Sequence, residues 1–165
     1  MPVARSTPIP LLVILVCLVA RPLAAQDATP DSAFRALQQR GEVAMGVDQY
    51  TSWHHFDPLP DGGRIALERD SLDAPGRAAI RAHLAHIAQA FARGDFALPG
   101  FVHAHDVPGT RVMTAKRAAI RYEFHPLPGG GEVRITTRDP EALAAVHAFL
   151  AFQRHDHRVG DPGPH

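Results

Sequence analysis

Hydrophobic and polar positions along the chain predict two similar units, each a β-hairpin followed by a helix. The segment Phe56–Leu67 recurs 68 positions later as Phe124–Ile135. In both copies, alternating apolar residues flank a turn rich in Pro and Gly, which is typical of a hairpin. Apolar residues at helical spacing then predict helices at about residues 74–93 and 140–155.

A single hairpin buries too little surface to be stable, so the two units are expected to share one sheet. We predict an α+β fold in which two duplicated hairpin–helix units, at about residues 50–93 and 118–157, form a four-stranded, mainly antiparallel sheet with the helices on one face. A further helix is predicted for Asp31–Met45. The long connection 94–117 is rich in apolar residues and is expected to pack onto the body. Residues 26–161 would form one domain, and residues 162–165 a flexible tail.

Residues 1–25 have the pattern of an export signal. Arg5 precedes the apolar run Leu11–Ala20, and the segment ends in the small residues Ala24 and Ala25. We expect cleavage after Ala25, a periplasmic or secreted protein, and no membrane attachment after cleavage. An uncleaved anchor and a lipoprotein modified at Cys17 are the alternatives. Because Cys17 is the only cysteine, the cleaved chain would have no disulfide and no thiolate ligand.

Composition narrows the classes of function. The chain has 165 residues, of which 45% are hydrophobic and 21% are charged, as is usual for one globular domain. Lys and Arg number 17, and so do Asp and Glu. A chain with this charge balance lacks the strongly basic surface that binds nucleic acids or anionic membranes. We therefore expect no nucleic-acid partner, and the sequence does not identify a partner protein or a small molecule.

Histidine carries the candidate chemistry, with 11 residues in the chain. Strand alternation places His54 on the face that meets the helices, where a buried imidazole needs a partner. His83 lies beside the buried stripe of the first long helix, and His86 lies one turn further on and closer to solvent. In the second unit the two aligned helix positions are Phe149 and Phe152. The first unit thus has imidazoles where the second has aromatic packing, which suggests a function.

The connection adds His103 and His105, which face the same side if this segment is extended. Three neutral imidazoles that converge on one point are the ligands that Zn, Cu or Ni prefer. The sequence therefore predicts a divalent-metal site with His54, His83 and His103 as ligands and with His86 and His105 as auxiliary ligands. Since no tight metal motif is present, each histidine could instead be a hydrogen-bonding or capping residue.

Other functions stay open, including whether the chain is an enzyme at all. The same imidazoles could act as general acids or bases in a small hydrolase or lyase, with Asp57 or Asp106 as the carboxylate partner of His54 or His105. Alternatively, the chain could be a non-catalytic module whose open sheet face or Trp53 binds another protein.

A separate prediction concerns the end of the last helix. There, His155-Asp156-His157 is expected to complement the helix dipole.

Short motifs between about Arg40 and Asp161 carry a resemblance to a family. They are Asp48-Gln49-Tyr50-Thr51, His54-His55-Phe56, Gly62-Gly63, Ile80-Arg81-Ala82-His83-Leu84, Pro108-Gly109, Phe149-Leu150-Ala151-Phe152-Gln153 and His157-Arg158-Val159-Gly160-Asp161. These motifs resemble a family of small exported bacterial proteins of uncharacterised function, whose members often bear the label aspartate carbamoyltransferase by automatic transfer. The resemblance implies no catalytic residue. The chain also lacks the Ser-Thr-Arg-Thr phosphate-binding motif of that enzyme.

Overall fold

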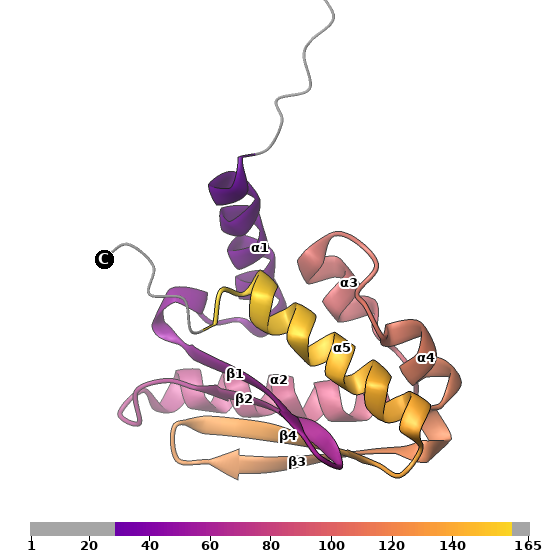
Figure 1. Ribbon diagram of the computed structural model, residues 1–165. Helices are drawn as coiled ribbons and strands as arrows, with labels where there is room; N and C mark the ends of the chain where they lie inside the picture. The colour runs from indigo at the N-terminus through magenta and orange to yellow at the C-terminus, as the bar shows by residue number, and fades with distance from the viewer. Residues whose placement is uncertain (1–28, 160–165) are drawn as a thin grey trace, which may run out of the picture.

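Four strands form one antiparallel sheet in the computed structural model, which describes residues 29–159 (Figure 1). They lie in the order β1-β2-β4-β3. Their bounds are Trp53–Leu59 for β1, Gly62–Glu68 for β2, Ile120–Leu127 for β3 and Gly130–Thr137 for β4. The predicted α+β fold with a four-stranded sheet is confirmed. The predicted export signal at residues 1–25 and the predicted tail at residues 162–165 lie outside the described residues.

The two hairpins meet through their inner strands, β2 and β4. Gly62 pairs with Thr136, Glu68 pairs with Gly130, and Ile65 pairs with Val133. Ile65 and Val133 are equivalent positions of the two sequence repeats, so this register relates the hairpins by an approximate two-fold axis. The duplication of the units itself stays a prediction.

Glycine makes the close approach of these inner strands possible. At Gly62, where φ is +150°, a Cβ atom would lie 2.0 Å from the Ile135 carbonyl oxygen. At the equivalent Gly130, a Cβ atom would lie 2.1 Å from the Leu67 carbonyl oxygen. These two glycines stand at the first positions of β2 and β4 and allow the backbones of the two strands to approach closely.

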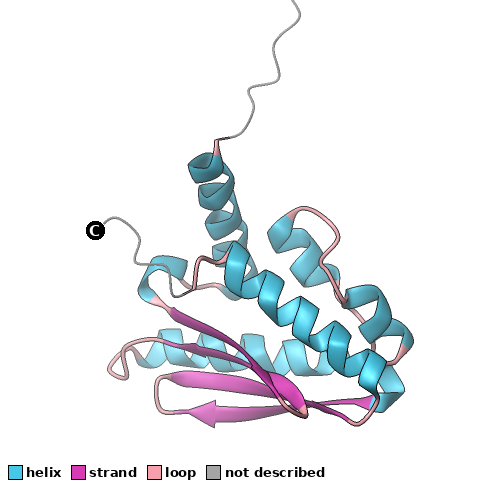
Figure 2. Ribbon diagram, viewed as in Figure 1, coloured by secondary structure: helices cyan, strands magenta, loops and turns pink. Residues whose placement is uncertain are grey.

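Two long helices, α2 (Ala74–Ala92) and α5 (Pro140–Asp156), cover one face of the sheet (Figures 1 and 2). Each begins after an aspartate whose carboxylate accepts hydrogen bonds from backbone N–H groups of the first turn, Asp73 for α2 and Asp139 for α5. Such caps satisfy donors that the helix itself leaves free. The buried stripe predicted for α2 is confirmed; it consists of Ile80, Leu84, Ile87 and Phe91.

Helix α1 (Pro30–Met45) packs against α3 (Ala97–His103), and α4 (Thr110–Ala115) packs against α5. Two 3-10 turns, η1 (Gln49–Thr51) and η2 (Arg117–Ala119), precede β1 and β3. The connection 94–117 therefore packs onto the body as expected. However, the segment is not extended, which was the condition for His103 and His105 to face the same side, although their ring centroids lie 6.2 Å apart. Helix α3 ends at His103, and Ala104 adopts the left-handed conformation with φ of 60°, which turns the chain between the two histidines.

The other face of the sheet carries charges that pair with one another. Arg64 lies 2.7 Å from an Asp57 carboxylate oxygen and 3.5 Å from one of Glu132. Trp53, at the start of β1, is 61% exposed. A charged face of this kind lacks the apolar centre of a stable protein interface. Within residues 29–159, no helix has both the length and the apolar character needed to cross a membrane.

Candidate functional site

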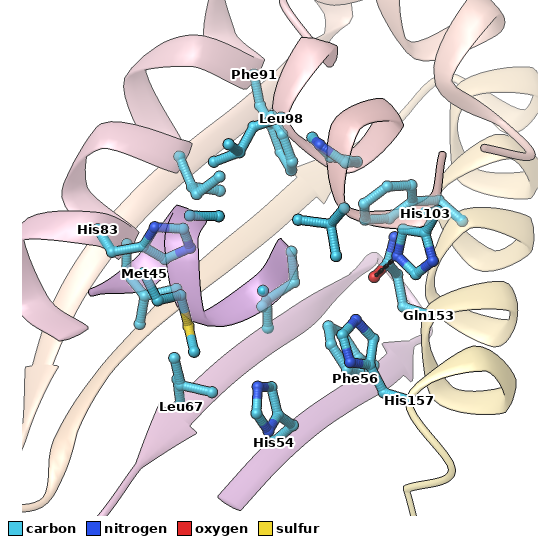
Figure 3. A pocket seen from close by; sticks show the side chains of 18 residues that line it. Met45, His54, Phe56, Leu67, His83, Phe91, Leu98, His103, Gln153 and His157 are labelled. Carbon is cyan, nitrogen blue, oxygen red and sulfur yellow. Dashed lines mark hydrogen bonds between the residues drawn. The ribbon is translucent and has the colours of Figure 1, made fainter. Parts of the chain in front are cut away.

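A cavity of about 90 Å³ lies between the covered face of the sheet and helices α1, α2, α3 and α5 (Figure 3). Its walls are mostly apolar and include Met45, Leu67, Leu84, Phe91 and Leu98. Four imidazoles interrupt this apolar lining, those of His54, His83, His103 and His157. No Lys, Arg, Asp or Glu of the described chain lines the cavity. The imidazoles are therefore the only titratable side chains among the described residues that line it.

His54 of β1 and His83 of α2 are uncharged at neutral pH. Burial lowers the pKa of each from 6.5 to about 4, because an apolar environment disfavours the protonated ring. Hydrogen bonding to the backbone of Ser52 and of Ala44, respectively, partly opposes this shift. Each imidazole is thus held by the backbone on one side and faces the cavity in its neutral form, and the inward orientation predicted for His54 is confirmed.

His157, directly after α5, also lines this cavity. It is not among the candidate site residues predicted from the sequence. Its ring stacks on His54 at a centroid distance of 5.3 Å and on Phe56 at 5.4 Å. Burial, together with the neighbouring His54 and His103, lowers its pKa from 6.5 to about 3. A neutral ring cannot complement a helix dipole, so that prediction is wrong for His157. The available signal was its spacing of four residues from the buried Gln153 and of eight from the buried Phe149.

His103 is held by two oxygen atoms of α5. Its Nδ1 is hydrogen-bonded to an Asp156 carboxylate oxygen, and its Nε2 lies 2.9 Å from Gln153 Oε1. Both ring nitrogens of His103 are therefore occupied by partners within the protein. The expected carboxylates are engaged elsewhere: Asp57 pairs with Arg64, and Asp106 offers His105 a backbone carbonyl rather than its side chain.

Two polar atoms on the α5 wall of the cavity have no hydrogen-bond partner among the described residues. They are Gln153 Nε2 and His157 Nδ1. Gln153 is only 4% exposed, and its position one turn before His157 places both side chains on one face of the helix end (Figure 3). Nearly all buried polar groups in proteins are hydrogen-bonded, so two neighbouring exceptions call for an explanation.

The structure separates the five predicted metal ligands into two groups. His54, His83 and His103 line the cavity, whereas His86 and His105 are exposed and lie outside it. His83 lies on the opposite side of the cavity from His103 (Figure 3). In residues 29–159, no group of three or more His, Cys, Asp or Glu side chains is arranged to hold a metal ion.

Comparison of the chain with known protein families, with curated proteins and with solved structures gives no match. The function must therefore be argued from the cavity and from the polar atoms that face it.

Proposed function

We propose that the protein binds a small uncharged molecule in the cavity between the sheet and helices α1, α2, α3 and α5. The observation that carries this proposal is the pair of unpartnered atoms, Gln153 Nε2 and His157 Nδ1. An unsatisfied buried polar group costs about 1–3 kcal/mol. A ligand with a carbonyl, amide or hydroxyl group would satisfy both atoms at once, because the Gln153 amide donates and a neutral imidazole nitrogen can accept or donate.

The size and the charge of the cavity restrict this ligand. An engineered apolar cavity of roughly 150 Å³ in another protein holds benzene, which has six non-hydrogen atoms. The space of about 90 Å³ here therefore suits about four such atoms, and the end of a slightly longer ligand would extend through the open side of the cavity. An ionised ligand would lose its hydration without gaining a counter-charge from the neutral rings of His54, His83 and His157. A short primary amide such as butyramide fits both restrictions.

Titration of the purified protein with butyramide tests the proposal, with the ring-proton NMR signals of His54 and His83 as the readout. We expect saturable shifts in the wild type. The variant His157→Phe keeps an aromatic ring but removes the nitrogen, and it should bind about tenfold more weakly, which corresponds to one lost hydrogen bond. His155→Phe is the matched control, because His155 is exposed and does not line the cavity. The absence of saturable binding, or equal affinity of His157→Phe and wild type, would refute the proposal.

A second candidate is the binding of Zn, Cu or Ni by the same imidazoles. It is favoured by the hydrogen bonds of His54 and His83 to the backbone, because metal-bound histidines usually have their other ring nitrogen bound in this way. His103 would complete the predicted set only if its Nε2 exchanged Gln153 Oε1 for the metal, and His157 would add a fourth ring after side-chain rotation. Calorimetric titration with the three metal chlorides at pH 7.5 tests this candidate. Binding that is lost in His54→Phe and retained in His86→Phe is expected, and an absence of binding by all three metals would refute it.

We do not propose the acid–base alternative, because Asp57 pairs with Arg64 and Asp106 bonds His105 only through its backbone carbonyl. Location in the periplasm or outside the cell stays a prediction from the sequence.

A further inference from the structure

The cavity adjoins a groove on the surface between α1, α2 and α3. Ala44, Met45, His83 and Leu98 line both the cavity and this groove. The cavity and the groove are therefore neighbours that share part of one wall. The groove continues past Leu98 along His86 and ends beside Phe101.

The lining of the groove is mainly apolar along its whole length. Its walls are Ala44, Met45, Ala79, Ala82, Leu98 and, further along, Ala90, Ala97 and Phe101, with His83 and His86 beside them. Asp95 is the one residue with a formal charge among the described residues that line it. Phe101 is 49% exposed and adds apolar surface at this end of the groove.

The unpartnered polar atoms and the groove lie at different ends of the cavity. Gln153 and His157 belong to the α5 wall, whereas His83 lies on the opposite side (Figure 3). The His83 ring is neutral and is hydrogen-bonded to the Ala44 backbone. A hydrocarbon chain of a ligand could therefore pass beside this ring without meeting a charge. A molecule whose polar group reaches Gln153 and His157 would extend toward His83 and Leu98.

We propose that the natural ligand is an elongated amphiphile with one uncharged polar head and a single hydrocarbon chain. The head binds Gln153 Nε2 and His157 Nδ1, and the chain passes between His83 and Leu98 into the groove and ends against Phe101. This inference rests on the proposed function, because it uses the same head-group site, and it adds the chemical class of the ligand.

Binding of primary amides of increasing chain length tests the inference. Burial of each added CH2 group strengthens binding about fourfold, so octanamide should bind on the order of 100-fold more tightly than butyramide. Ala82→Asp places a charge in the groove and should remove this gain while leaving butyramide affinity unchanged. Ala148→Asp is the matched control, because Ala148 is the aligned, exposed position of α5 and lines neither the cavity nor the groove.

The outcomes separate this inference from the proposed function. If butyramide binds but affinity does not rise with chain length, or if Ala82→Asp keeps the full gain, the amphiphile is refuted and the small-ligand site stands. If butyramide does not bind, the proposed function fails and the amphiphile with it. A wild type that sediments as a dimer, with Ala82→Asp as a monomer, would show that a second copy covers the groove and would also refute the amphiphile.

Discussion

Acidification from pH 7.5 to 5.5 should destabilise the protein through the three neutral imidazoles of the cavity. In the unfolded chain a histidine has a pKa of about 6.5. In the folded protein the pKa is about 4 for His54 and His83 and about 3 for His157. Between pH 6.5 and about 4 the unfolded chain therefore binds protons that the folded protein does not. The stability is fully present above pH 6.5 and is lost as the pH falls through this window.

The magnitude follows from proton linkage. A fall of one pH unit below 6.5 lowers the free energy of unfolding by about 1.4 kcal/mol for each histidine that is protonated only in the unfolded chain. Three such groups lower the free energy of unfolding by about 4 kcal/mol between pH 7.5 and 5.5. Domains usually have a total stability of 5–15 kcal/mol, so this loss is large enough to bring the protein close to unfolding.

Urea unfolding at a series of pH values measures this effect, and the His157→Phe variant isolates one of the three groups. Between pH 7.5 and 5.5, the free energy of unfolding of this variant should fall by about 1.4 kcal/mol less than that of the wild type, since the remaining histidines are common to both proteins. At pH 7.5 the variant should also be about 1 kcal/mol more stable, because it no longer buries the unpartnered Nδ1 atom. His155→Phe should keep the wild-type pH dependence. A stability that does not change between pH 7.5 and 5.5, or equal pH dependence of His157→Phe and wild type, would refute the reasoning.

Three further substitutions test the contacts around the cavity, each by urea unfolding at pH 7.5. Asp156→Asn should cost about 2 kcal/mol, because it leaves the buried His103 without its carboxylate; an unchanged stability would contradict this hydrogen bond. Gly109→Ala should cost about 3 kcal/mol or more, because its φ is +83° and the new Cβ would lie 2.2 Å from the Ala145 carbonyl oxygen. Gly46→Ala has a similar φ of +73° but no atom within 4 Å, so it should cost only about 1 kcal/mol; equal costs at the two glycines would contradict the steric argument.

The fold was predictable because its signals are local. Alternation around the turns indicated the hairpins, and the predicted helices at about 74–93 and 140–155 agree closely with α2 (Ala74–Ala92) and α5 (Pro140–Asp156). The strand and helix periods also predicted which way the side chains of His54 and His83 point, because each type of element fixes the direction of successive side chains.

The rest of the site depends on contacts that no local pattern shows. Asp156 meets His103 across 53 positions of the chain, and the direction of His103 depends on a left-handed turn at Ala104, where alanine gives no sign of that conformation. His157 was assigned to the helix dipole because its position at the end of α5 suggested exposure, whereas the packing of α5 onto β1 buries it against His54 and Phe56.

The comparison between the two units explains why the imidazoles are informative. At the position aligned with His83, the second unit has Phe149, which is fully buried and packs on Phe91 at 5.7 Å between ring centroids. A phenylalanine can therefore occupy this helix position, and it fills the space without a polar atom that needs a hydrogen bond. The first unit instead has an imidazole at the rim of a cavity, and α5 adds two polar atoms without partners. Each of these choices lowers the stability of the protein alone, and under the proposed function the binding of a polar group inside the cavity would offset this loss.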